Sequence, residues 1–362
     1  MRQEELLVIN PGSTSTKIAV YQGEQPLFAK SLEHSDVAQY SGVMDQYQMR
    51  LDAIEGFLKE SDYDVARLSA VVGRGGMLLP LKSGAYRVND TMIARLRDNP
   101  VSQHESNLGA ILAQAIAKRA GVEAYIYDSV RVDELSDVAR VTGYPEIKRI
   151  AATHTLNSRG MCIRLAQEEG KRYQDLNFIV AHMGGGISVN VHEQGRMVEL
   201  VSDDEGPFSP QRCGAVPCRQ LVDLCFSGEY TKQDIRRRQS RTGGLKGYLD
   251  TDDTREVERR VLAGDKEAEL IYRAMAYQVS RAIGSLAPVV KGRVDYIVLT
   301  GGIAHSEMFT GWIKEQVAYL APVKIMPGEH EMASLALGIL RVQRGEEKAR
   351  EYIELEGKVI DG

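Results

Sequence analysis

Apolar and polar residues follow two different periods along this chain, and the first is the alternation expected of strands. Residues 6–22 contain an apolar run, the turn "NPGSTS" and a second run, and "QPLFAKSLE" continues the pattern. Residues 177–200, "NFIVAHMGGGISVNVHEQGRMVEL", show the same order of run, glycine-rich turn, run, polar turn and run. Each segment therefore predicts an antiparallel meander of three strands.

The two meanders share a spacing. When Asn10 is aligned with His182, Gly23 falls on Gly195, and the strand at 17–21 falls on the strand at 189–193. Two meanders with equal spacing and small residues in both first turns indicate an internal duplication. Chance similarity explains one such hairpin better than it explains two.

Helical spacing of apolar residues follows each meander. It is present in residues 41–60, 107–121, 267–286 and 333–346, with short apolar strands predicted at 68–76, 123–130 and 295–299. The alternation predicts an α/β protein built twice, with helices on both faces of each mixed sheet and a central cleft for the ligand. We expect an N-terminal domain of residues 1–149 plus 338–362, rejoined by the last helix, and a C-terminal domain of residues 150–337.

Composition narrows the class of protein. The 362 residues carry a net charge of −5, which argues against a protein devoted to nucleic acid. No apolar run approaches the ~20 residues of a membrane span. Because the sequence starts directly in a predicted strand, we expect no signal peptide. The four cysteines form no C-x₂-C pair, so we expect free thiols and a cytoplasmic location.

The glycine- and hydroxyl-rich turns are candidate anion sites. Tight turns expose several peptide N–H groups together, and Ser or Thr hydroxyls add donors. Neither turn is a G-x-x-x-x-G-K-[ST] loop, and neither begins a helix as a dinucleotide fingerprint does. Two ordinary hairpins are the alternative interpretation, but the duplication and a further glycine pair in "LTGGIA" favour two turns that bind a polyphosphate.

Five segments together resemble a known family. "VINPGSTSTKIAV", "AHMGGGISV", "DDEGPFSPQRCGAVP" and "VLTGGIAHS", with "THTLNSRG", are similar to the acetate and butyrate kinases, within the superfamily of sugar kinases, actin and Hsp70 ATPases. The "NPGSTST" and "EGPFSP" forms are nearer to the butyrate branch. The resemblance implies duplicated RNase H-like (actin-like ATPase) domains and Mg²⁺-dependent transfer of a phosphoryl group from ATP to a short-chain fatty acid, with butyrate expected.

A carboxylate acceptor is already ionised near pH 7 and needs no base, so catalysis rests on positioning and on screening of negative charge. Arg74 in "VVGRGG" and Arg212 in "SPQRCG" are candidate clamps on the carboxylate and the phosphoryl group, although Arg74 is displaced relative to the family's arginine. By resemblance, His154 contacts the phosphoryl group, and Asp128 is a catalytic residue that orients the metal or its waters.

Nucleotide contacts are expected in both turns and in the C-terminal half. The residues implied are Asn10, Ser13, Thr14, Thr16, His182, Gly184, Gly185, Gly186, Asp253, Arg255, Gly301, Gly302 and Ile303. A simple helix-start charge cluster is the alternative for Asp253 and Arg255. The metal ligands implied are Asp128, Asn10 and Glu331, with Glu329 as the alternative because the register of "GEHE" is open.

Other activities stay open. An acetate, propionate or branched-chain acid kinase would use the same mechanism, and one methylene in an apolar pocket discriminates weakly. A sugar kinase would need a base, for which Asp128 is available. An actin- or Hsp70-like switch would need a partner domain, and few residues follow Gly338. The family also implies a homo-oligomer, with ADP or ATP and a fatty acid or its acyl phosphate as ligands.

Overall fold

The computed structural model describes residues 4–151 and 153–361, and the chain divides into two compact units. Unit 1 comprises Met1–Asp133 and His330–Gly362, and unit 2 comprises Glu134–Glu329. Residues 1–3 and 362, which the expected N-terminal domain included, lie outside the described residues. The two units are described separately below.

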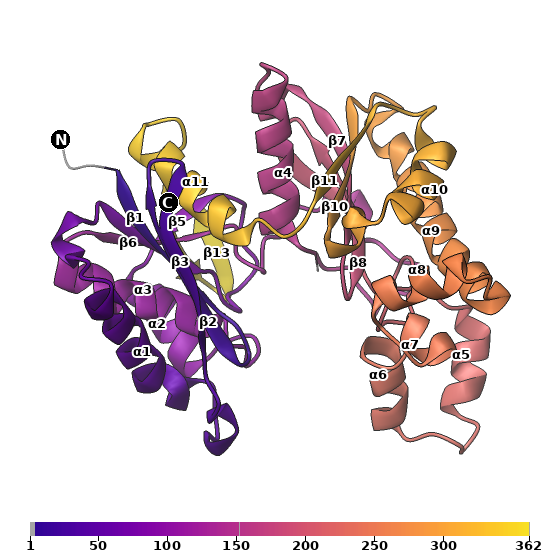
Figure 1. Cartoon of the computed structure of the whole chain (residues 1–362), viewed down its shortest axis with the longest axis horizontal. Coiled ribbons are helices and arrows are strands. Elements are labelled where there is room, and N and C mark those ends of the chain that lie inside the picture. The colour runs from indigo at the N-terminus through magenta and orange to yellow at the C-terminus, as the bar shows by residue number, and fades with distance from the viewer. Residues whose placement is uncertain (1–3, 152, 362) are drawn as a thin grey trace. The chain divides into compact units, whose positions relative to one another are not determined.

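Unit 1 is built on a mixed sheet with the strand order β13-β12-β5-β6-β4-β1-β2-β3. β1, β2 and β3 form the antiparallel meander, and β4 and β6 lie parallel to β1 (Figure 1). The strands are β1 (Glu5–Pro11), β2 (Ser15–Gln22), β3 (Gln25–Glu33), β4 (Ala70–Arg74), β5 (Ala85–Arg87), β6 (Glu123–Tyr127), β12 (Arg350–Leu355) and β13 (Lys358–Asp361).

Helices cover the sheet of unit 1. α1 and α3 bury their apolar faces with β1, β2 and β4 in one core, and α11 contacts β1, β4 and β6 (Figure 1). The last predicted helix therefore does return to the first domain. The helices are α1 (Tyr47–Glu60), α2 (Asp90–Asp98), α3 (Asn107–Ala120) and α11 (Glu331–Gln343), with short 3₁₀ helices at Val37–Gln39, Met44–Gln46 and Val65–Arg67.

Unit 2 repeats the central part of this sheet, with the order β11-β10-β7-β8-β9. β7, β8 and β9 are antiparallel, and β10 and β11 are parallel to β7. The strands are β7 (Asn177–Met183), β8 (Ile187–Glu193), β9 (Arg196–Val201), β10 (Tyr296–Gly301) and β11 (Val323–Pro327). Both units thus contain a meander followed by two parallel strands, and the predicted duplicated RNase H-like α/β fold is confirmed.

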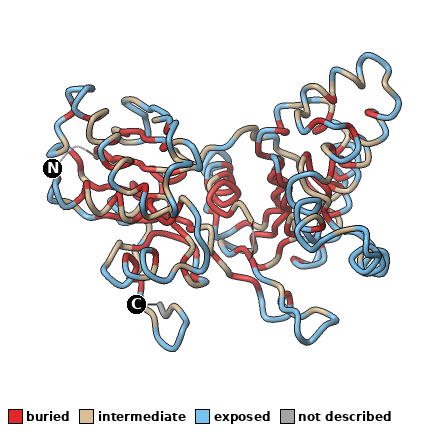
Figure 2. The backbone as a smooth tube through the Cα atoms, turned by 90° about the horizontal axis from the view of Figure 1, so that it is seen from below, coloured by how far each residue is buried: buried red, intermediate tan, exposed pale blue. Residues whose placement is uncertain are grey.

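The central strands β7, β8 and β10 of unit 2 are buried on both faces, and Figure 2 shows where such buried stretches of the chain lie. Ile179 and Ala181 of β7 pack with α9, whereas Phe178 and Val180 of the same strand pack with α4. The helices are α4 (Thr155–Glu168), α5 (Cys218–Cys225), α6 (Lys232–Ser240), α7 (Gly244–Leu249), α8 (Thr254–Leu262), α9 (Lys266–Leu286) and α10 (Glu307–Val317), with 3₁₀ helices at Val138–Arg140, Tyr173–Asp175, Ala287–Val290 and Gly302–His305.

The constant spacing between the two meanders holds only as far as their first turns. Asn10 pairs with Lys17 across the first hairpin, but His182 pairs with Ser188 rather than Val189. The second turn is one residue shorter, so the predicted match between the strands at 17–21 and 189–193 is one residue out of register. Because side chains alternate along a strand, that slip would exchange the two faces of the sheet.

The domain boundaries fall earlier than the expected 149/150 and 337/338. Glu134 and Ser136 bond to β9, where the backbone of Ser136 donates to Val198 and Met197 donates to the Glu134 carboxylate. Arg149 forms ion pairs with Glu199 and Glu205 of unit 2. The 134–149 segment therefore packs with unit 2. At the other end, α11 packs as one amphipathic element on the sheet of unit 1, so the whole helix belongs there.

Among the residues that the structure describes, no helix combines the length and the apolar character that a membrane span requires. Cys162, Cys213, Cys218 and Cys225 are free thiols, and only Cys162 is fully buried. Burial raises the pKa of Cys162, so this thiol is a packing residue in its protonated form.

Candidate functional site

The first turn connects β1 to β2 and presents its tip to solvent. The backbone N–H of Gly12 donates to the carbonyl of Ser15 at 2.8 Å, and Ser13 and Thr14 are exposed. Thr16, predicted to bind phosphate, is instead buried, and its Oγ1 lies 2.9 Å from Nε2 of His34. The alternation of β2 turns its side chain to the inner face, so its hydroxyl is directed away from the exposed tip.

A cavity of about 230 Å³ lies beside this turn in unit 1. It brings together three of the predicted residues, Asn10 at the end of β1, Arg74 at the end of β4 and Glu331 at the start of α11. Arg74 forms an ion pair with Glu331, and Asn10 donates from Nδ2 to Glu331 Oε2 at 2.8 Å. A cation, an amide and a carboxylate thus meet from three distant parts of the sequence.

Sequence reasoning did not identify four other residues that line this cavity. They are Lys17, His104, Ser106 and Val130. His104 and Ser106 precede α3 and contact each other, with His104 Nδ1 2.8 Å from Ser106 Oγ. A signal was available, since "HES" before the helical run at 107–121 is a polar segment at a helix start, the kind of position at which side chains can reach a ligand.

Asp128 follows β6 but does not line the cavity. Its side chain is 1% exposed, and Oδ1 accepts a hydrogen bond from the backbone N–H of Gly84 at 2.7 Å. The residue has a left-handed backbone with φ of +40°. This conformation turns the chain sharply after the strand and directs Val130, two residues later, to the cavity. The structure therefore gives Asp128 a role in shaping this loop, and contact with a metal remains a prediction.

The second turn, Gly184–Gly186, lies in unit 2 between β7 and β8. Ser209, which is fully buried, donates from Oγ to the carbonyl of Gly185 at 2.6 Å and holds the turn in place. A Cβ atom on Gly186 would come within 3.1 Å of the Arg212 guanidinium carbon. Glycine at this position therefore lets the predicted clamp Arg212 lie directly against the turn.

Arg212 is held by the loop that carries it and by an acid. Its backbone N–H and carbonyl bond to Ser209, and its guanidinium pairs with Asp203. Burial lowers the pKa of Arg212 from its usual value, yet an arginine stays charged at any physiological pH. Gln211 beside it donates to Asp252 at 2.8 Å, which joins this loop to the segment that contains Asp253 and Arg255.

His154 and His182 are stacked in unit 2. Their ring centroids are 4.0 Å apart with planes inclined by 14°, and His182 is 1% exposed. Asn157 Nδ2 lies 2.9 Å from His182 Nδ1. When the Asn157 amide donates to Nδ1, the neutral ring carries its proton on Nε2 and can donate to an acceptor. Two of the predicted histidines are thus brought together beside the glycine turn.

A buried chain of polar groups leads away from His154 along β8, another feature that the sequence did not reveal. The chain runs from His154 through Ser188, Thr153, Asn190 and His192 to Tyr173. In this order, consecutive side chains lie 3.3, 2.9, 3.2, 2.8 and 2.7 Å apart. Burial lowers the pKa of His192 to about 3, and the charge of Arg159 contributes, so His192 is neutral.

The two acids of "GEHE" lie in different units. Glu331 lines the cavity of unit 1, whereas Glu329 belongs to unit 2 and its Oε1 lies 3.8 Å from Nε2 of His182. The geometry therefore favours Glu331 as the acid that acts with Asn10 and Arg74. Within residues 4–151 and 153–361, no cluster of three or more His, Cys, Asp or Glu residues is arranged to hold a metal.

The remaining nucleotide candidates differ in position. Gly301 ends β10 and Gly302 follows it, but Ile303 is 5% exposed and packs in the core of unit 2 rather than presenting its side chain to solvent. Asp253 caps α8 by accepting from the Arg255 backbone and side chain, which lowers the pKa of Asp253 to about 2. The helix-start alternative therefore describes the geometry of Asp253 and Arg255.

Comparisons with known proteins agree with this fold. Butyrate kinase 1 of Clostridium acetobutylicum is 48% identical over 351 residues, and a probable butyrate kinase of Clostridium botulinum is 46% identical over 352 residues. Each alignment covers 96% of this chain and 99% of the relative. The family resemblance stated above is thus confirmed.

Solved structures give the same result for the fold alone. Acetate kinase of Porphyromonas gingivalis superposes with a TM-score of 0.77 at 16% identity, over 93% of this chain and 99% of that chain. A propionate kinase of Francisella tularensis gives 0.70 at 18% identity, over 92% and 98%. The model of the Acetokinase family matches residues 151–319. Because butyrate kinases are 46–48% identical to it over 96% of its length, the chain belongs to the acetokinase family.

Proposed function

We propose that this protein transfers a phosphoryl group reversibly between ATP and butyrate, giving butyryl phosphate and ADP. The observation that carries the proposal is the convergence of Asn10, Arg74 and Glu331 in one cavity of a chain that is 46–48% identical to butyrate kinases. Formation of ATP from the acyl phosphate, as in fermentation, is the same reaction in reverse.

The chemistry suits a site rich in cations. A carboxylate oxygen of butyrate attacks the γ-phosphorus, an O–P bond forms, and the bond to the bridging oxygen breaks as ADP leaves with the electron pair. No proton moves, because the acceptor is ionised already. Arg74 is placed to bind the carboxylate or the phosphoryl group in unit 1 through charge-assisted hydrogen bonds.

Unit 2 supplies the groups that we assign to the nucleotide phosphates. Arg212, the Nε2–H of His182 and the ring of His154 surround the glycine turn, and each can stabilise charge on the phosphoryl oxygens. The buried hydroxyl of Ser209 fixes the turn itself. We assign the adenosine to Asp253, Arg255, Gly301 and Gly302, with Ile303 acting from the core rather than by direct contact.

The donor set of the unit 1 cavity fits Mg²⁺, which takes one or two carboxylates together with waters and phosphate oxygens. Glu331 and Asn10 would hold the ion, and both are already in contact with each other. When bound, Mg²⁺ neutralises charge on the transferring phosphoryl group. Until then Arg74 balances the carboxylate of Glu331.

A panel of carboxylates tests the proposal. Purified protein, MgATP and hydroxylamine are incubated with acetate, propionate, butyrate, isobutyrate and valerate, and the acyl phosphate is trapped as its hydroxamate. Arg212→Ala is compared with Arg172→Ala, which removes an arginine that is 75% exposed in the same unit. We expect most product with butyrate, a loss of roughly 10²–10³-fold in Arg212→Ala and none in Arg172→Ala.

Other results have clear meanings. A maximum with acetate, propionate or a branched acid keeps the mechanism and changes the substrate. Absence of hydroxamate with every acid, from protein that still binds ATP, would reject the carboxylate kinase and revive a hydroxyl kinase or a nucleotide-switched protein. The curated relatives favour butyrate over the smaller acids.

We also propose a cytoplasmic homo-oligomer. The free thiols are compatible with a reducing compartment. Val222, Leu224 and Phe226, in α5 and directly after it, expose apolar side chains that a second copy could cover. Sedimentation at several concentrations measures the assembly, and a monomer throughout would contradict it.

A further inference from the structure

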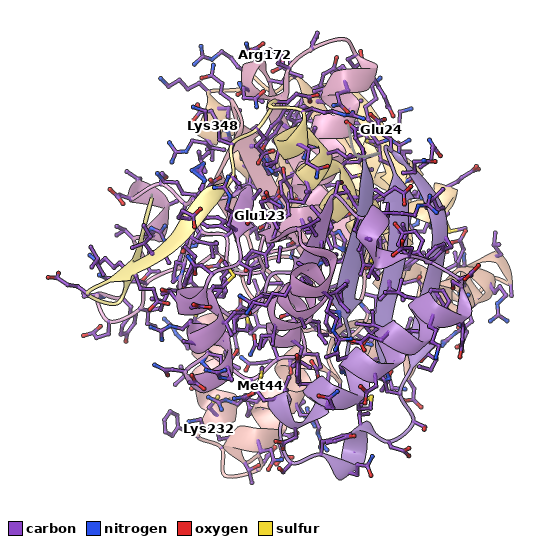
Figure 3. All side chains as sticks on the ribbon, turned by 90° about the vertical axis from the view of Figure 1, so that its left-hand side faces the viewer. Glu24, Met44, Glu123, Arg172, Lys232 and Lys348 are labelled. Carbon is purple, nitrogen blue, oxygen red and sulfur yellow. The ribbon has the colours of Figure 1, made fainter. Side chains whose placement is uncertain are left out.

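Arg50, on α1, lies beneath the turn that joins β1 and β2. It is 0% exposed, and its Nη atoms donate to the carbonyls of Gly12 and Ser15 at 2.9 Å and of Ser13 at 3.2 Å. Figure 3 marks Met44, just before α1, and Glu24, in the β2–β3 turn, at opposite ends of unit 1. Arg50 therefore bonds the turn before β2, whereas Glu24 lies in the turn after β2.

This arrangement orients the peptide groups of the turn. The C=O and N–H of one trans peptide point in opposite directions. Because the carbonyls of Gly12 and Ser13 point to Arg50, the N–H groups of Ser13 and Thr14 point to the exposed side. The structure records no acceptor for these two N–H groups among the described residues. Adjacent outward N–H groups form the concave donor site that suits an anion.

The charge of Arg50 has no ion-pair partner within the described residues. Its nearest side-chain acceptor is Gln46, the residue before α1, whose Oε1 accepts from Nη2 at 2.8 Å and from Nε at 3.1 Å. The charge of Glu105 also favours the charged form of Arg50, but no ion pair between the two is present in the described residues. His34 shares Thr16 with Arg50, and burial together with the charge of Arg50 lowers the pKa of His34, so that ring is neutral.

Burial of a cation without a counter-ion is costly in free energy. Burial lowers the pKa of Arg50, but a guanidinium does not lose its proton at physiological pH. The positive potential is therefore present directly behind the two outward N–H groups. An anion on the exposed side of the turn would supply the missing negative charge.

We propose that Arg50 is a positioning residue for the bound phosphoryl group: it orients the turn and supplies a positive potential behind it, without contact to the ligand. This inference rests on the proposed function, since the anion is taken to be a phosphate of ATP or of the acyl phosphate. The uncompensated charge, rather than the hydrogen bonds alone, is what raises affinity for the anion.

The variant Gln46→Glu distinguishes the effect of the Arg50 charge from the effect of its hydrogen bonds to the turn. The new carboxylate keeps an acceptor for Arg50 Nε and Nη2 and cancels the charge. Gln48→Glu is the matched control, because Gln48 is exposed two residues away and bonds only Asp52. Binding of MgATP and of adenosine to the full chain is measured by calorimetry, alongside denaturant unfolding.

We expect Gln46→Glu to unfold at the same or a higher denaturant concentration, to bind MgATP roughly tenfold more weakly and to bind adenosine unchanged. Gln48→Glu should leave both affinities unchanged and lower stability only slightly, because its carboxylate would lie beside that of Asp52. Unchanged MgATP affinity in folded Gln46→Glu would overturn the proposal. So would an equal loss for adenosine, because a purely structural effect does not depend on ligand charge.

Arg50→Lys and Arg50→Met provide a second test that does not depend on the folding of Gln46→Glu. Lys keeps the charge and loses the planar fork, so MgATP affinity should fall less than in Met, which loses both. Equal MgATP affinities in Lys, Met and wild-type proteins would overturn the role. Because binding is measured without turnover, failure here is distinguishable from failure of the butyrate kinase assignment.

Discussion

The turns of the two units occupy equivalent places in a repeated sheet but are held in different ways. In unit 1 the turn rests on Arg50, a buried cation with no ion-pair partner among the described residues, and the acid Glu331 lines the cavity beside the turn. In unit 2 the turn rests on the neutral hydroxyl of Ser209, and its cation, Arg212, lies in front of it and pairs with Asp203.

This difference shows what duplication preserves. The strand order and the placement of a turn after the first strand are common to both units, because they follow from backbone packing. The electrostatic support of each turn is specific, because it depends on single side chains from elements outside the meander. The two turns therefore differ in the charge that lies behind each of them. Three predictions test this comparison.

The largest effect on activity is expected at the two acids of "GEHE", Glu331 in unit 1 and Glu329 in unit 2. Glu331→Gln removes the charge that pairs with Arg74 and that we assign to Mg²⁺, so kcat should fall roughly 10²–10³-fold and the Mg²⁺ concentration for half-maximal activity should rise. Glu329→Gln, two residues earlier in unit 2, should lower kcat by severalfold at most. Hydroxamate formation over a Mg²⁺ titration measures both.

Thermal unfolding of both variants is the control for this pair. An equal or larger loss in folded Glu329→Gln would reverse the assignment and place the critical acid beside His182. If both variants were as active as the wild-type protein, neither Glu331 nor Glu329 would take part in catalysis.

An intermediate effect is expected where β10 ends beside the second turn. Gly301 has φ of +89°, and a Cβ there would come within 2.4 Å of the Met183 carbonyl oxygen. Gly301→Ala should lower the free energy of unfolding by about 2–4 kcal/mol. Gly302→Ala meets no atom within 4 Å and should change it by less than about 1 kcal/mol. Urea unfolding compares them, and equal values would contradict the close approach.

The most gradual effect is expected along β8 of unit 2, where the chain of polar groups includes His192. The pKa of His192 is lowered from 6.5 to about 3, so between these values the unfolded chain binds a proton that the folded chain does not. The contribution of neutral His192 to the free energy of unfolding is complete above pH 6.5. It decreases as the pH falls towards 3, by at most about 1.4 kcal/mol for each pH unit.

His192→Gln should flatten this part of the pH profile while lowering stability at pH 7. Exposed His305→Gln is the matched control and should keep the wild-type slope. Free energies of unfolding from pH 4 to 8 provide the test, and a His192→Gln profile parallel to the wild type would exclude the buried histidine as the source.

Local pattern was sufficient for much of this molecule. The alternation in residues 6–22 and 177–200 predicted both hairpins, and the helical period predicted α1, α3, α9 and α11 to within a few residues. It did not predict β12 and β13, because short exposed strands carry a weak apolar signal and form only where an edge such as β5 is available.

The site was predicted unevenly for the same reason. The motifs that singled out Asn10, Arg74 and Glu331, and likewise His154, His182 and Arg212, have a distinctive local form. The structure brings each set together, and their roles stay predictions. The side chains of Thr16 and Ile303 are buried, which the sequence did not predict. Motif letters do not say which way a side chain turns, and strand alternation and core packing decide it.

The sequence by itself determined the duplicated α/β architecture, the two turns and the family. Only the tertiary structure decided that Arg50 lies behind the first turn, that Ser188, Asn190 and His192 form a buried polar chain, and that Glu331 rather than Glu329 joins Arg74. Periodicity and turn chemistry act between near neighbours along the chain. The charge environment of a group depends on residues far away in sequence, and folding alone brings these together.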